Sequence, residues 1–299
     1  MNTADGAELL SPLLKTAGLD PYPGREPIRV WTRSGVERLQ VSGGGTVVFK
    51  YAQEPFDREH LALNLAARSG LPVPRVLAAQ TAPGTLGMLL EDLGQPIRDA
   101  GQQDAAECAV SIHRVFVVNA GWLPRLDRTS LARLPARIAA RAGRLDLPGH
   151  IADTANLLAR HAQQLAQGTD LPPYGFCHSE FHPTSVHIGS HGRRLLDFAR
   201  AFVGPGLLDL ASWPGTLTAP DTKAVAALIG AYIQAGGPPE TAAPRGGMPA
   251  ANWALGWHRI WISDWYAEQI ERGWAGEEIT AWTDTISRHL NEATALLAT

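Results

Sequence analysis

The stretch Tyr174–Trp213, YGFCHSEFHPTSVHIGSHGRRLLDFARAFVGPGLLDLASW, holds most of the candidate chemistry, and the rest of the chain is interpreted as the scaffold around it. Residues 178–185 mix His, Ser and Pro, a composition that predicts a loop. The turn-forming residues at 190–192 separate two short strand-like runs and predict a β-hairpin. We expect this hairpin to bring two carboxylates, Glu180 and Asp197, to one site.

Several residues of this stretch match a known pattern in place. His178, His182 and Pro183 fit a loop that reads His-Gly-Asp-x-His-Pro-x-Asn, and Asp197 follows Glu180 by seventeen residues, as the pattern requires. The stretch therefore resembles the catalytic segment of the aminoglycoside phosphotransferase and choline kinase family, whose members are relatives of the protein kinases.

The resemblance implies a role for each residue. In the family, the loop's Asp receives the proton of the acceptor hydroxyl, its Asn binds metal, and a second Asp holds the metal ions on the nucleotide phosphates. Here Glu180 replaces the first Asp and Ser185 replaces the Asn, while Asp197 is retained. Glu180 is thus implied as the proton acceptor, with His182 as the next candidate, and Asp197 and Ser185 as ligands of Mg²⁺. The segment 204–211 resembles the family's following motif, Gly-Asp-Pro-x-x-Asp-Leu-Ala.

Bulk composition excludes several classes of function. With 299 residues, 45% of them hydrophobic, the chain can bury a sizeable core. A net charge of −3 without an extended basic cluster argues against nucleic-acid binding. No apolar run approaches the roughly 20 residues that span a bilayer, and the N-terminus lacks the pattern of an export signal. Two cysteines, Cys108 and Cys177, are too few for a disulfide framework, so we expect a cytoplasmic protein.

The first fifty residues combine a helix pattern with strand patterns. Residues 5–18 predict a short helix, and the prolines at 21, 23 and 27 predict an irregular approach to the first strand. β-Branched and aromatic residues predict strands at 29–31, 38–41 and 47–52.

Two turns between these strands invite different interpretations. Gly43-Gly44-Gly45 predicts a hairpin turn rather than a phosphate loop, because no helix follows it. The turn Thr32–Val36 is the better phosphate candidate. Its small residues Ser34 and Gly35 would let backbone amides approach a triphosphate, as the resemblance implies.

An acid and a lysine flank the next loop. Lys50 closes the apolar run Val47–Phe49, and Glu59 follows nine residues later, early in a helix predicted from 57 to about 68. This resembles the family's ion pair, which fixes a cation on the α- and β-phosphates of ATP or GTP. The alternative is a solvated lysine and an acid favoured by the helix dipole. Downstream, a strand at 87–93 ends near Glu91 and Leu93, whose backbone groups are implied to hydrogen-bond the purine edge.

The chain after residue 102 reads as mainly helical, with apolar residues three and four apart. The predicted helices are 104–117, 130–145, 150–165, 222–234, 250–272 and 277–297. His113 is interpreted as a core histidine without chemistry. Trp253, Trp257, Trp261 and Trp265 recur every four residues, and two interpretations stay open for them: core packing, or an aromatic pocket for the acceptor.

Together the patterns and the resemblance predict an α+β, two-lobed, protein-kinase-like fold. A small antiparallel-sheet lobe is expected at residues 1–94 and a larger, mainly helical lobe at 95–299. The implied activity is transfer of the γ-phosphoryl group of ATP or GTP, with Mg²⁺, to a hydroxyl of a small molecule. An antibiotic or related secondary metabolite is the expected acceptor. Nothing in the sequence identifies that acceptor or the oligomeric state.

Two alternatives remain open. His178, Glu180 and His182 also form His-x-Glu-x-His, which in an extended segment would point three potential zinc ligands to one side. The second alternative is a catalytically inactive, pseudokinase-like binding protein. A carboxylate displaced by one methylene, as in Glu180, is misplaced by on the order of 1 Å, which can cost roughly a hundredfold in rate. The retained charge of Glu180, the hydroxyl of Ser185 and the intact Asp197 favour catalysis.

Overall fold

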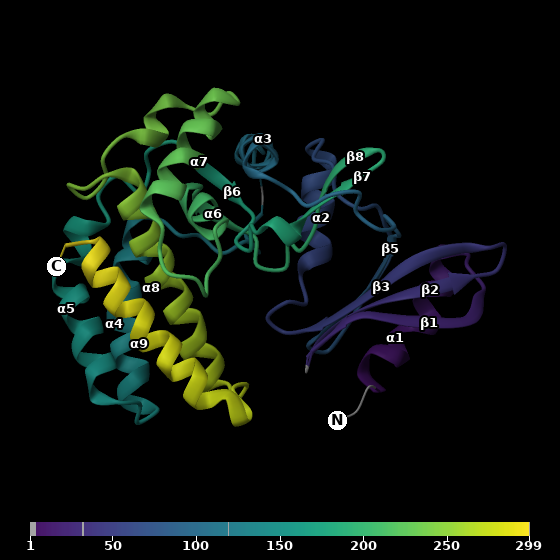
Figure 1. Cartoon of the computed structure of the whole chain (residues 1–299). Helices are drawn as coiled ribbons and strands as arrows, with labels where there is room; N and C mark the ends of the chain where they lie inside the picture. Colours follow the sequence, from purple (N-terminus) through teal and green to yellow (C-terminus); the bar gives the residue numbers. More distant parts are fainter. Residues whose placement is uncertain (1–3, 32, 119, 299) are drawn as a thin grey trace. The chain divides into compact units, whose positions relative to one another are not determined.

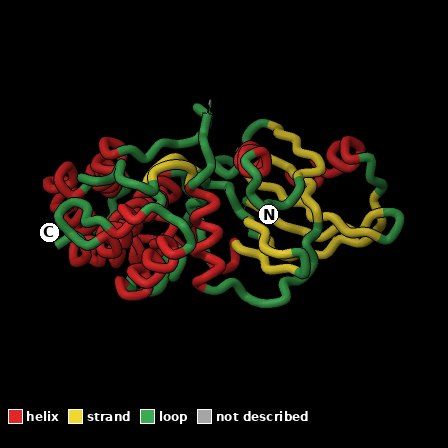
Figure 2. The backbone as a smooth tube through the Cα atoms, turned by 90° about the horizontal axis from the view of Figure 1, so that it is seen from above, coloured by secondary structure: helices red, strands yellow, loops and turns green. Residues whose placement is uncertain are grey.

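The computed structural model describes residues 4–31, 33–118 and 120–298, and these form two compact units. The strand-rich unit comprises residues 1–100 and 184–201, and the helical unit comprises residues 101–183 and 202–299. Figures 1 and 2 show an antiparallel sheet in the first unit and a mainly helical second unit, which confirms the α+β prediction. The lobe boundary that we propose at residue 94 follows chain order, whereas by spatial contacts segment 184–201 groups with the strand-rich unit.

The strand-rich unit is built on a five-stranded antiparallel sheet of order β1-β2-β3-β5-β4. Its strands are β1 (Pro21–Val30), β2 (Ser34–Val41), β3 (Gly45–Gln53), β4 (Val76–Ala82) and β5 (Thr85–Glu91). The helices α1 (Ala4–Ala17) and α2 (Glu59–Arg68) and the hairpin β7 (Val186–Gly189) to β8 (Gly192–Leu195) complete the unit. The predicted turn between β2 and β3 is confirmed, with positive φ angles of 97° at Gly43 and 86° at Gly44.

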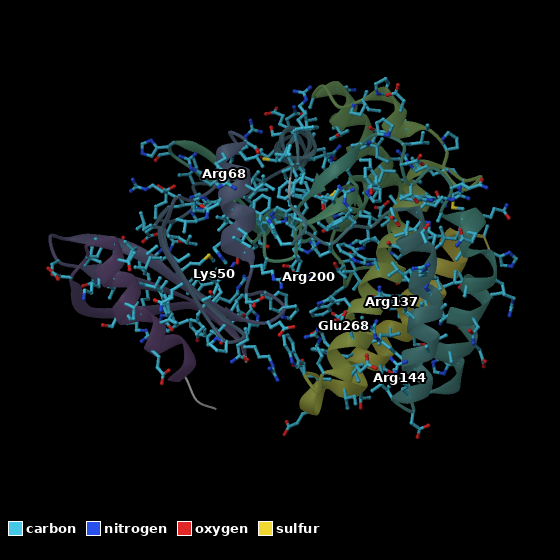
Figure 3. All side chains as sticks on the ribbon, turned by 180° about the vertical axis from the view of Figure 1, so that it is seen from behind. Lys50, Arg68, Arg137, Arg144, Arg200 and Glu268 are labelled. Atoms are coloured by element: carbon cyan, nitrogen blue, oxygen red, sulfur yellow. The ribbon has the colours of Figure 1, made fainter. Side chains whose placement is uncertain are left out.

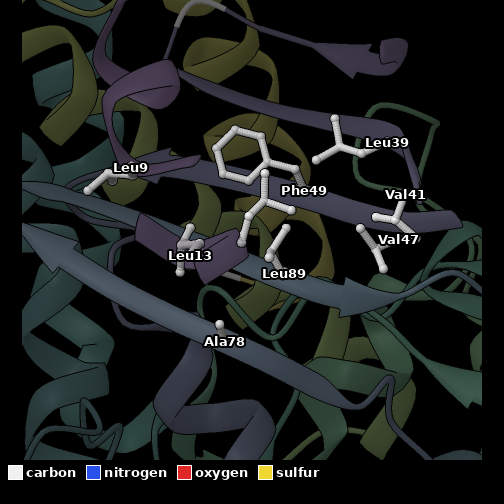
Figure 4. Packing of buried hydrophobic residues seen from close by; sticks show 9 residues of the cluster. Leu9, Leu13, Leu39, Val41, Val47, Phe49, Ala78 and Leu89 are labelled. Carbon is white, nitrogen blue, oxygen red and sulfur yellow. The ribbon is translucent and has the colours of Figure 1, made fainter. Parts of the chain in front are cut away.

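A small apolar core fixes α1 on the sheet. Leu9 and Leu13 of α1 pack with Phe49 of β3 and Leu89 of β5, and all four are at most 5% exposed (Figure 4). Burying such a side chain contributes about 2 kcal/mol. This packing holds β3, the strand that carries Lys50, in the middle of the sheet.

The prediction of an irregular approach at residues 21–27 was wrong, because this segment belongs to β1. The ladder between β1 and β2 shifts register between Pro21 and Arg25 and again between Pro27 and Arg29. Proline cannot donate to a ladder, but it is tolerated on an edge strand and at a bulge. β1 is an edge strand, so its irregularities accommodate the prolines without ending the strand.

The helical unit follows the predicted helical pattern within a few residues. Its helices are α3 (Gln102–His113), α4 (Arg128–Arg144), α5 (Gly149–Leu165), α6 (Leu207–Ser212), α7 (Thr222–Gln234), α8 (Ala250–Glu271) and α9 (Ile279–Leu296). The strands β6 (Tyr174–Cys177) and β9 (Phe202–Pro205) pair antiparallel within it. None of the helices within the described ranges is long and apolar enough to cross a membrane.

The tryptophans of α8 divide between the two interpretations. Trp253 and Trp257 are fully buried and Trp261 is 9% exposed, so these three belong to the core. Trp265 is half-buried, and its ring lies 6.1 Å from that of Trp282 on α9. Core packing therefore accounts for the first three, and only Trp265 is accessible enough for an aromatic pocket.

Two side chains anchor the loop that follows α6. Arg259, which is 1% exposed, donates to the carbonyls of Thr216 and Thr218. His289, which is fully buried, has Nε2 3.1 Å from the Thr216 carbonyl, so this nitrogen is the donor. Burial and the nearby charges of Arg259 and Arg288 lower the pKa of His289 to about 3, against the opposing effect of the bond to Thr216.

This histidine makes the stability of the helical unit depend on pH. Below about pH 6.5 the unfolded chain protonates His289 and the folded chain does not, so stability is lost as pH falls toward the folded pKa of about 3. Burial raises the pKa of Asp264 to about 6. This carboxyl has the opposite effect on stability, because over an overlapping pH range the folded chain takes up its proton before the unfolded chain does. We therefore compare wild type with His289→Gln by urea unfolding between pH 7 and 4.5, where the wild type is expected to lose roughly 1 kcal/mol per pH unit relative to the variant. Parallel curves would contradict this.

Candidate active site

Lys50 is held by two acids within the strand-rich unit. Its Nζ lies 2.8 Å from an oxygen of Glu59 and forms an ion pair with Asp197 (Lys50 is labelled in Figure 3). The side chains of Lys50, Glu59 and Asp197 are 12%, 1% and 44% exposed. Burial disfavours a charged lysine, but the attraction of Asp197 and Glu59 outweighs it, so the pKa of Lys50 is raised. The structure thus contains a fixed cation between two carboxylates, which excludes the solvated-lysine interpretation.

Local structure explains how these three residues meet. Lys50 lies inside β3 rather than at its end, paired in register with Met88 of β5. Glu59 is the first residue of α2, where the helix dipole also stabilises its negative charge. Asp197 follows β8 and has a φ of 61°, the left-handed region that few residues other than glycine adopt and that stores strain at functional sites.

Ser185 is tied to the same segment. It ends the short 3₁₀ helix Pro183–Ser185 and is 2% exposed, and its carbonyl accepts from the amide of Leu196 at 2.9 Å. This bond fixes the backbone of Ser185 next to the residue that precedes Asp197. The predicted β-hairpin is confirmed as β7 and β8, and its second strand ends at Leu195.

A cavity of about 550 Å³ opens beside Lys50. All of its lining residues belong to the strand-rich unit, and they include the lysine and both acids. Apolar walls come from Val36, Val48, Leu63, Leu90 and Leu196, and Trp31 adds a half-exposed indole. A cavity of this size with apolar walls and a few charged groups at one end is typical of a small-molecule site.

The β1–β2 turn contributes less than the sequence predicted. Ser34 begins β2, where its carbonyl accepts from the Trp31 amide at 2.8 Å, and Gly35 is buried under the ring of Tyr51. A Cβ on Gly35 would lie 2.5 Å from that ring, so close packing by itself accounts for the glycine. Neither Ser34 nor Gly35 lines the cavity, and their contact with phosphates stays a prediction. Thr32, the first residue of the predicted turn, lies outside the described residues.

Glu91 and Leu93 do line the cavity, at the end of β5. The Glu91 amide already donates to the Arg75 carbonyl at 3.0 Å, and its carboxylate lies 3.9 Å from Arg194. Gly94, with a φ of 70°, turns the chain away, and its amide donates to Asp92 at 2.9 Å. Purine recognition by the backbone at 91–93 stays a prediction. The turn at Gly94 holds the backbone of these residues in place.

The candidate catalytic loop belongs to the helical unit and is held from α6. Asp209, fully buried, accepts from the amides of His178 at 2.7 Å and Ser179 at 2.8 Å. Ser212, at the end of α6, donates to the Phe181 carbonyl at 3.1 Å, and its own carbonyl accepts from Nδ1 of His182 at 2.9 Å. His182 is therefore anchored through Nδ1, and Glu180 lies half-buried between these fixed points.

The anchoring role of Asp209 was not predicted from the sequence. Its signal was present, as an acid in the 204–211 motif, but that pattern does not specify a partner. The zinc alternative finds no support. Among the residues with described positions, the one group of three or more possible ligand atoms is His113, Cys177 and Asp209, which includes none of His178, Glu180 and His182.

Comparison with known proteins decides the family. The sequence profile of the phosphotransferase enzyme family matches residues 38–246. The chain belongs to this family. No curated protein sequence matches it.

Solved structures share the fold of this phosphotransferase at low sequence identity. A macrolide 2'-phosphotransferase type I has a TM-score of 0.67 at 17% identity, covering 96% of this chain and 98% of that one. An amicoumacin kinase in complex with AMP-PNP, Ca²⁺ and Ami has a TM-score of 0.63 at 12% identity, covering 97% and 93%. A choline/ethanolamine kinase family protein from Mesorhizobium loti has a TM-score of 0.61 at 16% identity, covering 97% and 99%.

The oxygen donors of the strand-rich unit fit the divalent metal that phosphotransferases of this family use. Asp197 offers a carboxylate that is 44% exposed, next to the cavity, and Ser185 is fixed in the same segment. Carboxylate, hydroxyl and phosphate oxygens are the donors that Mg²⁺ prefers. The residues present therefore suit a hard cation bound together with nucleotide phosphates.

Proposed function

We propose that this phosphotransferase transfers the γ-phosphoryl group of ATP or GTP to a hydroxyl of a small molecule, an antibiotic or a related secondary metabolite. The observation that carries the proposal is the cation at Lys50, fixed between Glu59 and Asp197 at the wall of a nucleotide-sized cavity. Phosphoryl transfer needs mainly positioning and charge stabilisation from a protein, and this arrangement supplies both. The cytoplasm, where ATP and GTP are available, is the proposed location.

Each residue has a defined part in the proposed reaction. Lys50 binds the α- and β-phosphates, and Asp197 and Ser185 would hold Mg²⁺, which would neutralise charge on the phosphates. The bond between the γ-phosphorus and its bridging oxygen breaks as the bond to the acceptor oxygen forms. Glu180 orients the acceptor hydroxyl and takes its proton, and ADP or GDP leaves. His182 is the second candidate base, because its Nδ1 donates to the Ser212 carbonyl and Nε2 is the ring nitrogen that can accept a proton.

The charges on α8 favour a neutral acceptor over a polycation. Each acid of its C-terminal half pairs with arginine, in the contacts Arg137–Asp264 at 2.8 Å, Arg141–Asp264 at 2.6 Å, Arg144–Glu271 at 2.6 Å and Arg272–Glu268 at 2.9 Å. Figure 3 labels Arg137, Arg144 and Glu268 of this group. A polycationic aminoglycoside would have to compete with these guanidinium groups. The half-buried ring of Trp265 offers an apolar surface instead, which supports macrolides and similar acceptors within the proposal.

Calorimetry with a non-hydrolysable ATP analogue tests the nucleotide part of the proposal. We expect binding that requires Mg²⁺, and we expect Lys50→Met to weaken it by about tenfold because a charge-assisted contact to phosphate is lost. Lys223→Met is the matched control, since Lys223 is an exposed lysine on α7. Equal affinity in all three proteins, or binding unaffected by Mg²⁺, would contradict the proposal. Normal binding without turnover on any acceptor would instead identify a pseudokinase.

A further inference from the structure

Arg29 on the edge strand β1 is a second cation beside the cavity that contains Lys50. Its side chain lines this cavity, and its guanidinium carbon lies 5.3 Å from the centre of the Trp31 ring. At this distance a guanidinium group is attracted to the face of an indole. Trp31 is 51% exposed and lines the cavity as well. The proposed mechanism uses neither side chain.

A bulge in β1 brings Arg29 to the cavity side of the sheet. Pro27 lies opposite Glu37 on β2. Arg29, two residues on, lies opposite Val36, so Ile28 is an extra residue on β1. Successive residues of a strand alternate between the two faces, and directly opposite residues share a face. Val36 lines the cavity and Glu37 does not, so a regular ladder would have turned Arg29 away from the cavity.

The sequence accounts for this bulge, and the sheet places Arg29 in line with Lys50. Proline has no N–H for the ladder and is found at bulges, which re-aim side chains next to functional sites. Arg29, Val36 and Lys50 are paired in one row across β1, β2 and β3. Two strand spacings separate Arg29 from Lys50, or roughly 10 Å between backbones. Two long side chains can bridge this distance with a phosphate group between them.

The charges around the cavity leave Arg29 available for an anion. The lining acids are Glu26, Glu59, Glu91, Asp92 and Asp197. Lys50 pairs with Glu59 and Asp197, and Arg38 pairs with Asp92 at 2.6 Å and with Glu26 at 3.4 Å. No acid among the described residues pairs with Arg29. Among the described lining residues, Arg29 is therefore the cation whose charge no carboxylate offsets.

A phosphate chain is the ligand that suits this guanidinium group. A nucleoside triphosphate carries several negative charges, of which a bound Mg²⁺ would offset only part. The planar fork of an arginine matches two phosphate oxygens, and hydrogen bonds between such charged groups are the stronger ones. Stacking on Trp31 fixes the plane of the guanidinium group and leaves the N–H donors at its edge free.

We propose that Arg29 is a second phosphate-binding residue, which contacts the phosphate chain of the nucleotide from β1 while Lys50 contacts it from β3. Trp31 is the positioning residue that holds the guanidinium group. This inference rests on the nucleotide part of the proposed function. The competing explanation is a surface pair, in which Arg29 only shields the indole of Trp31 from water.

Calorimetry with ligands of decreasing phosphate number distinguishes the two explanations. The ligands are a non-hydrolysable ATP analogue, ADP and adenosine, each with Mg²⁺. We expect Arg29→Gln to bind the ATP analogue about tenfold more weakly, ADP less so, and adenosine as the wild type does. Arg29→Lys keeps the charge without the planar fork and should lose about threefold. Trp31→Leu should show a loss of similar size that also decreases with phosphate number.

Arg68→Gln is the matched control. Arg68 is an exposed arginine in the last turn of α2, outside the cavity lining, and is labelled in Figure 3. This variant should bind all three ligands as the wild type does. Raising the ionic strength from about 0.05 M to about 0.5 M should reduce the difference between wild type and Arg29→Gln, because the contact is exposed to solvent.

Inorganic triphosphate separates this inference from the proposed function. We expect the wild type to bind it and Arg29→Gln to bind it about tenfold more weakly. If the wild type binds inorganic triphosphate in this way but no nucleotide, the proposed function fails and the inference stands. Wild-type affinity of Arg29→Gln for both the ATP analogue and inorganic triphosphate would overturn the inference alone. An equal loss for adenosine and the ATP analogue would also overturn it, and a wild type that binds none of these ligands would overturn both.

Discussion

Asp197→Asn is expected to lower turnover by at least roughly a thousandfold and to weaken Mg²⁺-dependent nucleotide binding. The substitution removes the charge that we propose as the principal protein ligand of the metal, and it also removes one of the two acids that pair with Lys50. Asparagine suits this position because it tolerates the left-handed backbone seen there, with φ at 61°. The loss can therefore be assigned to charge rather than to a strained fold.

Steady-state kinetics and calorimetry on the same samples measure this effect. Asp284→Asn, an exposed position on α9, is the matched control and should retain wild-type values. A variant at Asp197 that binds Mg²⁺ and nucleotide with wild-type affinity would show that the metal is held elsewhere. The thermal midpoint, followed in parallel, confirms that the fold is intact.

Glu180→Gln is expected to lower kcat by roughly 10²–10⁴ while leaving nucleotide affinity nearly intact. Glutamine keeps the size and hydrogen-bonding capacity of the side chain but cannot take the acceptor proton. Because the cavity beside Lys50 lies wholly in the strand-rich unit, the substitution changes none of its lining residues. Substitution of Asp197 is therefore expected to impair both nucleotide binding and turnover, whereas substitution of Glu180 is expected to impair turnover alone.

Glu180→Asp completes this comparison, and the exposed Glu240→Gln is its control. Aspartate restores the residue usual in the related loop, but the neighbouring backbone is fixed by Asp209 and Ser212, so we expect partial activity. Full activity of Glu180→Gln would make this carboxylate structural. His182 would then be the next candidate base, through the ring nitrogen that is not bonded to Ser212.

Local patterns were sufficient for most of the fold. The periodicity of residues 222–234 gave α7 at its observed bounds, and the glycines at 43 and 44 gave the β2–β3 turn. The pattern failed at residues 21–27, because whether proline can stay in a strand depends on the position of that strand in the sheet. Sheet order is a long-range property that local composition does not contain.

The candidate site also depends on long-range contacts that local sequence patterns do not contain. The pairing of Lys50 with Glu59, on a strand and a helix close in sequence, was implied by the resemblance, and it is present. The contact of Lys50 with Asp197 joins segments 147 residues apart, and no local pattern predicted it. Only the resemblance implied that both residues act at the nucleotide phosphates. The phosphate contact of Gly35 stays a prediction, and packing against the ring of Tyr51 also requires a glycine there, since a glycine needed for packing and one needed for a ligand look alike in sequence.

An acceptor screen scored by mass is the most direct test of the central claim. Wild type and Glu180→Gln are incubated with Mg²⁺, ATP or GTP, and a panel of macrolides, aminoglycosides, nucleoside antibiotics, choline and sugars. We predict that a neutral antibiotic gains the mass of one phosphoryl group in the wild-type reaction, only with Mg²⁺, and roughly 10²–10⁴ times more slowly with Glu180→Gln. Nucleotide binding without phosphoryl transfer to any of these acceptors, or equal rates for the two proteins, would contradict the account.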